Sequence, residues 1–227
     1  MGSAPERESP RYSPKFASQS VKSPFCQRSA AVGMQKSPNF EPEMAQKTLL
    51  NQRDCAVTLS RLCHQLNEVH VPWNRTVLVG LQPRGSKLLK ALVHQLESEF
   101  GTGPIAHGLL DITFHRDDFR RRDEPLVASP TEMDVLIEGK RVVLIDDVLY
   151  TGRSVRAALD ALGDFGRPER VELCVLVDRR FSRELPIQPD YSGRRVDALN
   201  HERVRLNWNG DLLESVLLES PEYAPEH

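Results

Sequence analysis

Two adjacent carboxylates end an apolar run in the stretch RVVLIDDVLYTGRSVRAAL, Arg141 to Leu159. Asp146 and Asp147 are followed by the small-residue turn YTGRS and then by a helical pattern. The first N–H groups of a helix are unpaired and carry about half a positive charge, which suits a phosphate. Thr151 and Ser154 add hydroxyl donors, while carboxylates beside a phosphate accept hydrogen bonds from sugar hydroxyls or face a metal. This pattern predicts a site for a ribose 5-phosphate.

Short apolar runs alternate with helical patterns along the chain, and this alternation must position the two acids. Strands are expected at 76–80, 105–113, 141–146 and 170–178, and helices at 49–69, 86–100 and 154–165. Strands and helices that alternate in this way predict an α/β fold with a mostly parallel sheet flanked by helices. Ligands of such sheets bind at the carboxyl ends of the strands, where Asp146 and Asp147 stand. Two later runs, 202–208 and 214–220, are expected to supply edge strands.

The composition is that of an ordinary globular protein, with 27% charged residues and a net charge of −2 in 227 residues. Nucleic-acid binding would therefore require a local basic patch. The cysteines show neither CxxC spacing nor a neighbouring histidine cluster, so we expect free thiols rather than a zinc site, three of them in the core. They are Cys26, Cys55, Cys63 and Cys174. The sequence has no apolar segment long enough to cross a bilayer and no secretory signal, which predicts a cytoplasmic protein.

Residues 1–43 differ from the rest of the chain because they are rich in Ser, Pro, Arg and Lys and lack a periodic apolar pattern. This composition predicts disorder. Ser-Pro pairs recur at Ser9, Ser13, Ser23 and Ser37. One interpretation is a phosphorylatable or RNA-touching arm. The interpretation we favour is an extension without a function of its own, with Met34 or Met44 as the true start.

The stretch VVLIDDVLYTGRS closely resembles the phosphoribosyl pyrophosphate (PRPP) signature of the type I phosphoribosyltransferases. Its DDVLYTGR core resembles one branch, the bifunctional pyrimidine operon attenuation regulators and uracil phosphoribosyltransferases (the PyrR family). Three more segments are similar to family elements in the family's order: VLVGLQPRG to the pyrophosphate loop, LLDITFHRDD to the strand before the mobile active-site loop, and LVDRRFSRELPI to the base-binding hood. The resemblance implies one phosphoribosyltransferase domain over 44–227, with a small hood at about 179–200.

The resemblance also implies a set of site residues. The PRPP site would comprise Pro83, Arg84, Gly85, Asp146, Asp147, Val148, Leu149, Tyr150, Thr151, Gly152, Arg153 and Ser154. Within it, Pro83 to Gly85 would face the pyrophosphate, the two acids the ribose hydroxyls, and Thr151 to Ser154 the 5-phosphate. Uracil would lie at Asp178 and Arg179, read largely by backbone groups. Mg2+ would bridge the pyrophosphate oxygens, with its protein ligands unknown.

Catalysis in such a transfer is mostly positioning and charge stabilisation. We expect Arg84 and, from the mobile loop, Arg116 to neutralise the leaving pyrophosphate, with Asp146 and Asp147 completing the catalytic set. Pro83 replaces the threonine expected in the family's loop. An X-Pro bond lowers the cost of a cis peptide from about 3 to about 1 kcal/mol, so we expect Pro83 to tune this loop without abolishing binding.

A second activity, RNA binding, is implied by the same resemblance. In the family, a dimer binds a stem-loop in pyrimidine-operon leader mRNA when UMP or UTP occupies the active site. The matching positions are Ser60, Arg61, His64, Arg183 and Arg194. At two further positions the sequence departs from the family, because Val69 and Gln188 stand where arginine is expected, and each lost phosphate contact weakens RNA binding.

Three functions therefore remain open. The first is a uracil phosphoribosyltransferase that also regulates pyrimidine genes through leader mRNA. The second is an RNA-binding regulator with negligible turnover. The third is a purine-salvage phosphoribosyltransferase of the same fold, which the VLYTGR and RELPI spellings disfavour. The resemblance implies a homodimer or a higher homo-oligomer, and we expect no association with membranes.

Overall fold

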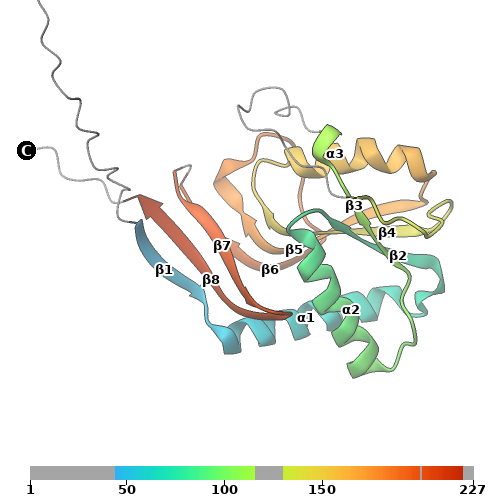
Figure 1. Ribbon diagram of the computed structural model, residues 1–227, viewed down its shortest axis with the longest axis horizontal. Helices are drawn as coiled ribbons and strands as arrows, with labels where there is room; N and C mark the ends of the chain where they lie inside the picture. The colour runs from blue at the N-terminus through green and yellow to red at the C-terminus, as the bar shows by residue number, and fades with distance from the viewer. Residues whose placement is uncertain (1–43, 116–129, 200, 222–227) are drawn as a thin grey trace, which may run out of the picture. The chain divides into compact units, whose positions relative to one another are not determined.

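The structure of the chain, a computed structural model, describes residues 44–115, 130–199 and 201–221. Its centre is a five-stranded parallel sheet in the order β3-β2-β4-β5-β6 (Figure 1). The strands are β2 (Thr76–Leu81), β3 (His107–Leu110), β4 (Arg141–Leu149), β5 (Arg170–Arg179) and β6 (Tyr191–Val196). The predicted α/β class with a parallel sheet is therefore confirmed.

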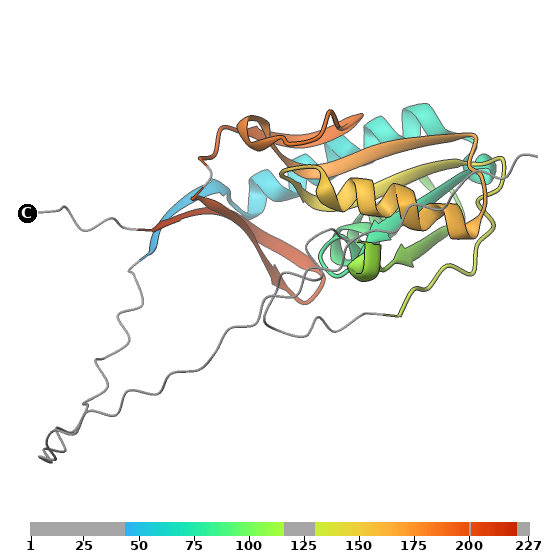
Figure 2. The ribbon, with the colours of Figure 1, turned by 90° about the horizontal axis from the view of Figure 1, so that it is seen from above.

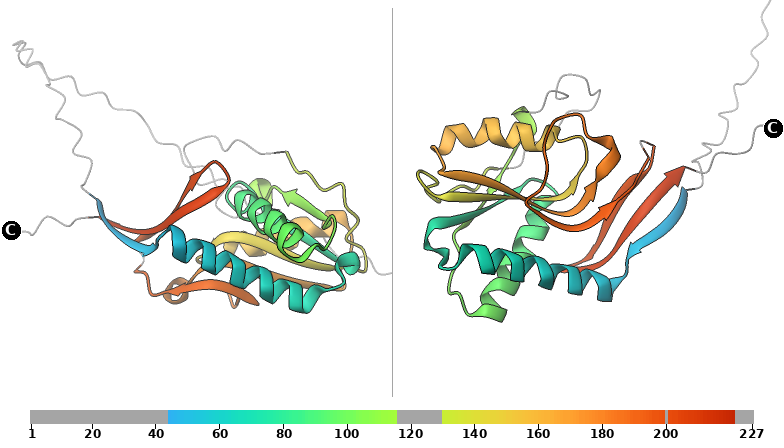
Figure 3. Two further views of the ribbon diagram at one scale, coloured as in Figure 1. Left: turned by 90° about the horizontal axis from the view of Figure 1, so that it is seen from below. Right: turned by 180° about the vertical axis from the view of Figure 1, so that it is seen from behind.

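Helices cover both faces of this sheet. The helices α1 (Gln52–His70) and α2 (Gly85–Phe100) lie on one face, and α3 (Arg153–Leu162) lies on the other (Figures 1 and 2). The view from below shows α1 and α2 side by side across the strands (Figure 3). Helix α1 begins after Asn51, whose side chain accepts a hydrogen bond from the Asp54 backbone N–H at 3.0 Å. This N-cap explains why the helix starts at Gln52 rather than at residue 49.

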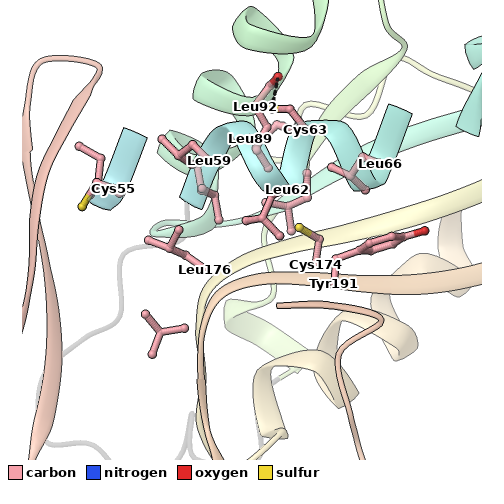
Figure 4. Packing of buried hydrophobic residues seen from close by; sticks show 14 of the residues in the cluster. Cys55, Leu59, Leu62, Cys63, Leu66, Leu89, Leu92, Cys174, Leu176 and Tyr191 are labelled. Carbon is pink, nitrogen blue, oxygen red and sulfur yellow. Dashed lines mark hydrogen bonds between the residues drawn. The ribbon is translucent and has the colours of Figure 1, made fainter. Parts of the chain in front are cut away.

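The core beneath α1 and α2 follows from helical spacing. Leu59, Leu62 and Leu66 of α1 point toward Cys174 and Leu176 of β5 (Figure 4). Leu62 and Leu66 are fully buried, and each contributes about 2 to 3 kcal/mol through removal of apolar surface from water. A second cluster fills the opposite face between α3 and the sheet. As expected, three cysteines are buried free thiols: Cys55, Cys63 and Cys174.

The C-terminal strands correct one sequence expectation. Strands β7 (Arg203–Asn209) and β8 (Leu212–Pro221) do form, but they are not edges of the central sheet. They make a separate antiparallel sheet with β1 (Met44–Leu50), in the order β1-β8-β7. A turn with Gly210 at φ 60° joins β7 to β8 as a hairpin, which favours antiparallel pairing. Strand β1 was not predicted.

Two shorter differences concern the central sheet. The strand expected at 105–113 ends at Leu110, because the Asp111 carboxylate turns the chain by accepting hydrogen bonds from Thr113 N at 2.9 Å and Thr113 Oγ1 at 2.6 Å. Within the predicted hood range, residues 191–196 form β6 of the central sheet. The predictions made for 1–43 and 116–129 lie outside the described residues. Among the described helices, none is both long and apolar enough to cross a membrane.

Candidate active site

The central sheet has its switch point between β2 and β4, which are hydrogen-bonded neighbours (Figure 1). After β2 the chain goes through α2 to β3 on one side, and after β4 it goes through α3 to β5 on the other. The two connections diverge at the carboxyl ends of these strands, and such switch points are where parallel sheets bind ligands. The loop 82–84 and the residues from Asp146 onward meet there.

Asp146 and Asp147 lie near the end of β4 and are 8% and 4% exposed. The Asp146 carboxylate accepts a hydrogen bond from Asp147 N at 2.9 Å, and the Asp147 carboxylate accepts one from Val148 N at 2.7 Å. Burial and then the neighbouring Asp147 carboxylate raise the pKa of Asp146 well above its usual range. The ionised forms of these two adjacent buried acids would therefore be stabilised by any ligand that brings hydroxyl donors or positive charge.

Arg84 and Gly85 bring the loop after β2 to these acids. Arg84 Nε lies 3.6 Å from Asp147 Oδ2, and the arginine side chain is 65% exposed. A Cβ on Gly85 would lie 2.3 Å from the Ile145 carbonyl oxygen, so only glycine allows this close approach to β4. The preceding Gln82–Pro83 peptide bond is cis. The sequence thus identified a loop that the fold brings against the two acids.

The turn after β4, residues 150–154, is called the phosphate loop below. Gly152 has φ 93°, in the region that favours glycine, and it directly precedes α3. The backbone N–H of Arg153 donates to Thr151 Oγ1 at 3.4 Å, a long contact. The first N–H groups of a helix have no partner within the helix, and Arg153 is the first residue of α3. The loop therefore has the backbone chemistry that an anionic group requires.

Asp178 and Arg179, predicted to lie at the base, are the last residues of β5, and both are buried. The Asp178 carboxylate pairs with the guanidinium of Arg183 and lies 3.9 Å from Arg195 Nε. The Arg179 guanidinium stacks on the Tyr150 ring at 4.1 Å and donates to the Leu199 carbonyl at 2.8 Å. Because both side chains have protein partners, a base bound here would meet mainly backbone groups.

A cavity of about 590 Å³ opens beside the end of β5. Its lining comprises Asp178, Arg180, Arg183, Pro186, Ile187, Gln188, Pro189 and Arg195. Arg180 and Arg195 were not among the predicted site residues. Arg180 pairs with Asp197 through two contacts of 2.7 Å. The sequence feature that indicates both residues is the large number of arginines before and after Asp178.

The positions predicted to contact RNA divide into two groups. Arg61 of α1 donates to the backbone carbonyls of Ser192 and Gly193, and it lines a second cavity of about 420 Å³ together with Arg194 and Arg195. Ser60 neighbours Arg61 on the same helix. The fold therefore gathers part of the predicted set on one face formed by α1 and β6.

The other two predicted RNA positions point elsewhere. His64 Nε2 lies 3.1 Å from Glu99 Oε1 of α2, and the His64 ring meets Phe100 edge-on at 4.9 Å. Arg183 donates to the Tyr150 carbonyl and pairs with Asp178, so it lies between the phosphate loop and the end of β5. Arg116, predicted to be catalytic, lies outside the described residues.

The chain is similar to known proteins in both sequence and fold. The profile of the phosphoribosyl transferase domain matches residues 45–208. A protein of Haemophilus ducreyi named bifunctional protein PyrR is 42% identical over 161 residues, which are 71% of this chain and 89% of the relative. Its namesake in Bacillus subtilis is 42% identical over 159 residues, 69% of this chain and 86% of the relative.

Solved structures share the fold at much lower identity. The hypoxanthine phosphoribosyltransferase of Trypanosoma cruzi has a TM-score of 0.58 at 16% identity, covering 78% of this chain and 97% of that chain. A hypoxanthine-guanine phosphoribosyltransferase of Bacillus anthracis has a TM-score of 0.54 at 15% identity, covering 68% and 86%. At such identities the likeness shows the fold alone.

Proposed function

The chain belongs to the phosphoribosyltransferase family and to its PyrR branch, and from this premise we propose that it makes UMP and pyrophosphate from uracil and PRPP. We further propose that it regulates pyrimidine-biosynthesis genes by binding leader mRNA when UMP or UTP is bound. The activity is assigned to one domain over 44–227, with the base covered by residues from 179–200. In this proposal the chain works in the cytoplasm.

The observation that carries the proposal is the contact between the two loops at the switch point. Arg84 Nε and Asp147 Oδ2 are 3.6 Å apart, although they are more than sixty residues apart in the sequence. This contact brings the guanidinium of Arg84, which suits an anionic leaving group, next to the carboxylate of Asp147, which suits ribose hydroxyls. The phosphate loop begins three residues after Asp147, so one PRPP molecule could span all three groups.

The reaction exchanges one bond at the anomeric carbon for another. The bond from that carbon to the pyrophosphate oxygen breaks, the bond to uracil N1 forms, and the N1 proton is released. Positive charge develops on the ribose and negative charge on the pyrophosphate. We assign stabilisation of the ribose to Asp146 and Asp147 and stabilisation of the pyrophosphate to Arg84, with Arg116 in the same role.

The site residues fit a magnesium ion carried by the substrate. Magnesium is usually held by one or two carboxylates together with waters and substrate phosphate oxygens, rather than by a cage of protein ligands. Asp146 and Asp147 offer hard oxygen donors, and the raised pKa of Asp146 shows that positive charge would be favourable beside them. Within the described ranges, no group of three or more His, Cys, Asp or Glu residues could hold a metal by itself. When bound, the ion would neutralise charge on the pyrophosphate oxygens.

The arginines on the face of α1 and β6 support the RNA partner. Arg61, Arg194 and Arg195 line one cavity there. Val69, which replaces an expected arginine, is 45% exposed at the end of α1. Because each phosphate contact adds affinity and steepens the salt dependence, we expect weaker RNA binding than a protein with the complete basic set would show. In the same proposal the RNA-binding form is a homodimer or higher homo-oligomer.

A nucleobase panel tests the enzyme proposal. Purified protein with PRPP and Mg2+ is given uracil, hypoxanthine, guanine or adenine, and nucleotide formation is followed at steady state. The proposal expects UMP and no purine nucleotide. Formation of a purine nucleotide in place of UMP would assign the chain to purine salvage, and no product with any base would leave a regulator without turnover.

A leader-RNA titration tests the second activity. A pyrimidine-operon leader RNA is titrated with protein across a salt series, with and without UMP. Binding that UMP strengthens, with a steep salt slope, supports regulation. Failure to bind even at low salt would contradict it and leave a salvage enzyme.

A further inference from the structure

Two carbonyl groups of the phosphate loop, those of Tyr150 and Thr151, have their donors in a segment some thirty residues further on. The Thr151 carbonyl accepts hydrogen bonds from Glu184 N at 3.0 Å and Leu185 N at 3.2 Å. The Tyr150 carbonyl accepts one from Arg183 Nη1. A turn that offers its N–H groups to a ligand needs other donors for its carbonyl groups, because unpaired backbone groups are costly. Segment 183–185 supplies these donors.

Glu184 holds the same loop a second time, through its side chain. Its Oε2 lies 2.7 Å from Arg153 Nε and 2.6 Å from Arg153 Nη2, so two donors of one guanidinium converge on one carboxylate oxygen. Arg153 is the first residue of α3, and its backbone N–H belongs to the predicted phosphate cradle. A contact that fixes the Arg153 side chain therefore also restrains the backbone group beside it.

Apolar contacts complete the attachment. A Cβ on Gly152 would meet Ile187 Cδ1 at 3.2 Å and Leu185 Cβ at 3.3 Å, so the loop packs closely on this segment. Hydrogen bonds, an ion pair and packing all join the same two short stretches. The loop cannot shift relative to 183–187 without loss of several of these contacts together.

We infer that Glu184 is a positioning residue for the 5-phosphate of PRPP, acting through Arg153. The inference rests on the proposed function, in which the phosphate loop binds that group. In this account Arg153 contributes its backbone N–H to the phosphate, while its side chain anchors the loop to Glu184. Glu184 itself touches no reacting atom.

Steady-state kinetics of Glu184→Gln test the inference. The substitution keeps the side-chain size and the backbone bond to Thr151 but removes the charge that holds Arg153. We expect the KM for PRPP to rise about three- to tenfold, with kcat and the KM for uracil within about twofold of wild type. A wild-type KM for PRPP, or a loss confined to kcat, would overturn the inference.

Glu169→Gln is the matched control. Glu169 forms an ion pair with Arg75 next to the amino end of β5, and the distance from Glu169 Oε2 to Arg75 Nη2 is 2.8 Å. The Glu169 side chain is 48% exposed, close to the 50% of Glu184. It should lose no more than the same small amount of stability as Glu184→Gln and keep a wild-type KM for PRPP. An equal rise in KM in this control would mean that the effect is a general consequence of a lost ion pair, which also overturns the inference.

A double-mutant cycle with Arg153→Gln asks whether Glu184 acts through Arg153. Each single variant should raise the KM for PRPP by a similar factor, and the double variant should raise it no further. If Arg153→Gln is far more damaging and the two effects multiply, the Arg153 side chain binds the phosphate directly and the inference is wrong.

Calorimetric titration with PRPP and Mg2+ separates this inference from the proposed function. If the wild type binds PRPP but makes no UMP, the proposed activity fails, while the effect of Glu184→Gln on the dissociation constant still decides the positioning role. If the wild type makes UMP and the variant binds PRPP equally well, only the positioning role fails.

Discussion

Acidic residues are buried at both ends of the central sheet, but their interaction partners differ between the two ends. At the amino end, His70 Nε2 lies 3.1 Å from both Glu172 Oε2 and the Tyr191 hydroxyl, and His70 Nδ1 lies 3.2 Å from Thr76 Oγ1. The other Glu172 oxygen is 2.9 Å from Arg170 Nε. Glu172 therefore has the Arg170 guanidinium beside one of its oxygens and the His70 ring beside the other. The acid at this end therefore contributes to structure.

At the carboxyl end, the acids are arranged for a ligand. Asp146 and Asp147 accept bonds from backbone N–H groups next to them, and Asp147 meets the exposed Arg84 at the longer distance of 3.6 Å. Burial and mutual repulsion leave this pair poorly stabilised, as the raised pKa of Asp146 indicates. The comparison teaches that buried acids mark a site where the fold leaves their charge incompletely balanced.

The largest expected effect comes from replacing both carboxyl-end acids. Asp146→Asn with Asp147→Asn should lower kcat/KM for UMP formation on the order of a thousandfold, because hydroxyl binding and charge stabilisation are lost together. Stability at pH 7 should be unchanged or higher. A carboxyl whose pKa is raised by folding stabilises the fold at low pH and loses that contribution as the pH rises. Denaturant unfolding and kinetics on one preparation measure both, and retained turnover with lost stability would contradict the account.

The amino end should show its role in the pH dependence of stability. Burial and then the charges of Arg141 and Arg170 lower the pKa of His70 to about 4. The unfolded chain takes up the proton near pH 6.5, so stability is full above that pH and falls progressively down to about pH 4. Between pH 6.5 and about pH 4, the free energy of unfolding should therefore fall by about 3 kcal/mol more in the wild type than in His70→Gln.

Chemical denaturation at several pH values checks this difference, and kinetics at pH 7.5 check its location. His70→Gln should keep kcat and both KM values within about twofold of wild type, because the network lies at the opposite end of the sheet. A large change in the KM for PRPP would break the distinction between the two ends.

A smaller effect is expected where the backbone, rather than charge, builds the site. Gly85→Ala places a Cβ 2.3 Å from the Ile145 carbonyl, so the loop that carries Arg84 must move. We expect a stability loss of about 2 kcal/mol together with a raised KM for PRPP. Gly163→Ala is the control, since a Cβ there meets nothing within 4 Å and its backbone is helical, and it should change stability by less than about 0.5 kcal/mol. Equal behaviour of the two variants would refute a special requirement at Gly85.

The α/β class and the phosphoribosyltransferase fold could be predicted because their signals are local. The acid pair and its turn are contiguous in sequence, and the alternation of strands and helices needs no knowledge of distant contacts. The small sheet could not be predicted in this way. Its β1 and β8 pair Met44 with Pro221, and this long-range pairing has no local signature in a short, mostly exposed strand such as β1.

The directions of the side chains were the other feature that the sequence could not predict. The resemblance implies that Arg183 contacts RNA, yet its guanidinium reaches the Tyr150 carbonyl and Asp178. Glu184 lies within the RELPI segment, but no sequence pattern indicates that its side chain reaches Arg153. His70 resembles a solvated histidine in the last turn of a helix, and only the packing of β2, β5 and β6 around it makes it part of a buried network.

Hydrogen exchange of the backbone amides, with and without PRPP and Mg2+, tests the central claim most directly. The account predicts that ligand slows exchange at the two carboxyl-end loops, residues 82–86 and 146–154, and in the attached segment 183–187. Exchange near His70 and in residues 170–173 should be unchanged. Protection at the amino end, or none at 146–154 when PRPP saturates the protein, would contradict the claim that the incompletely balanced acids mark the substrate site.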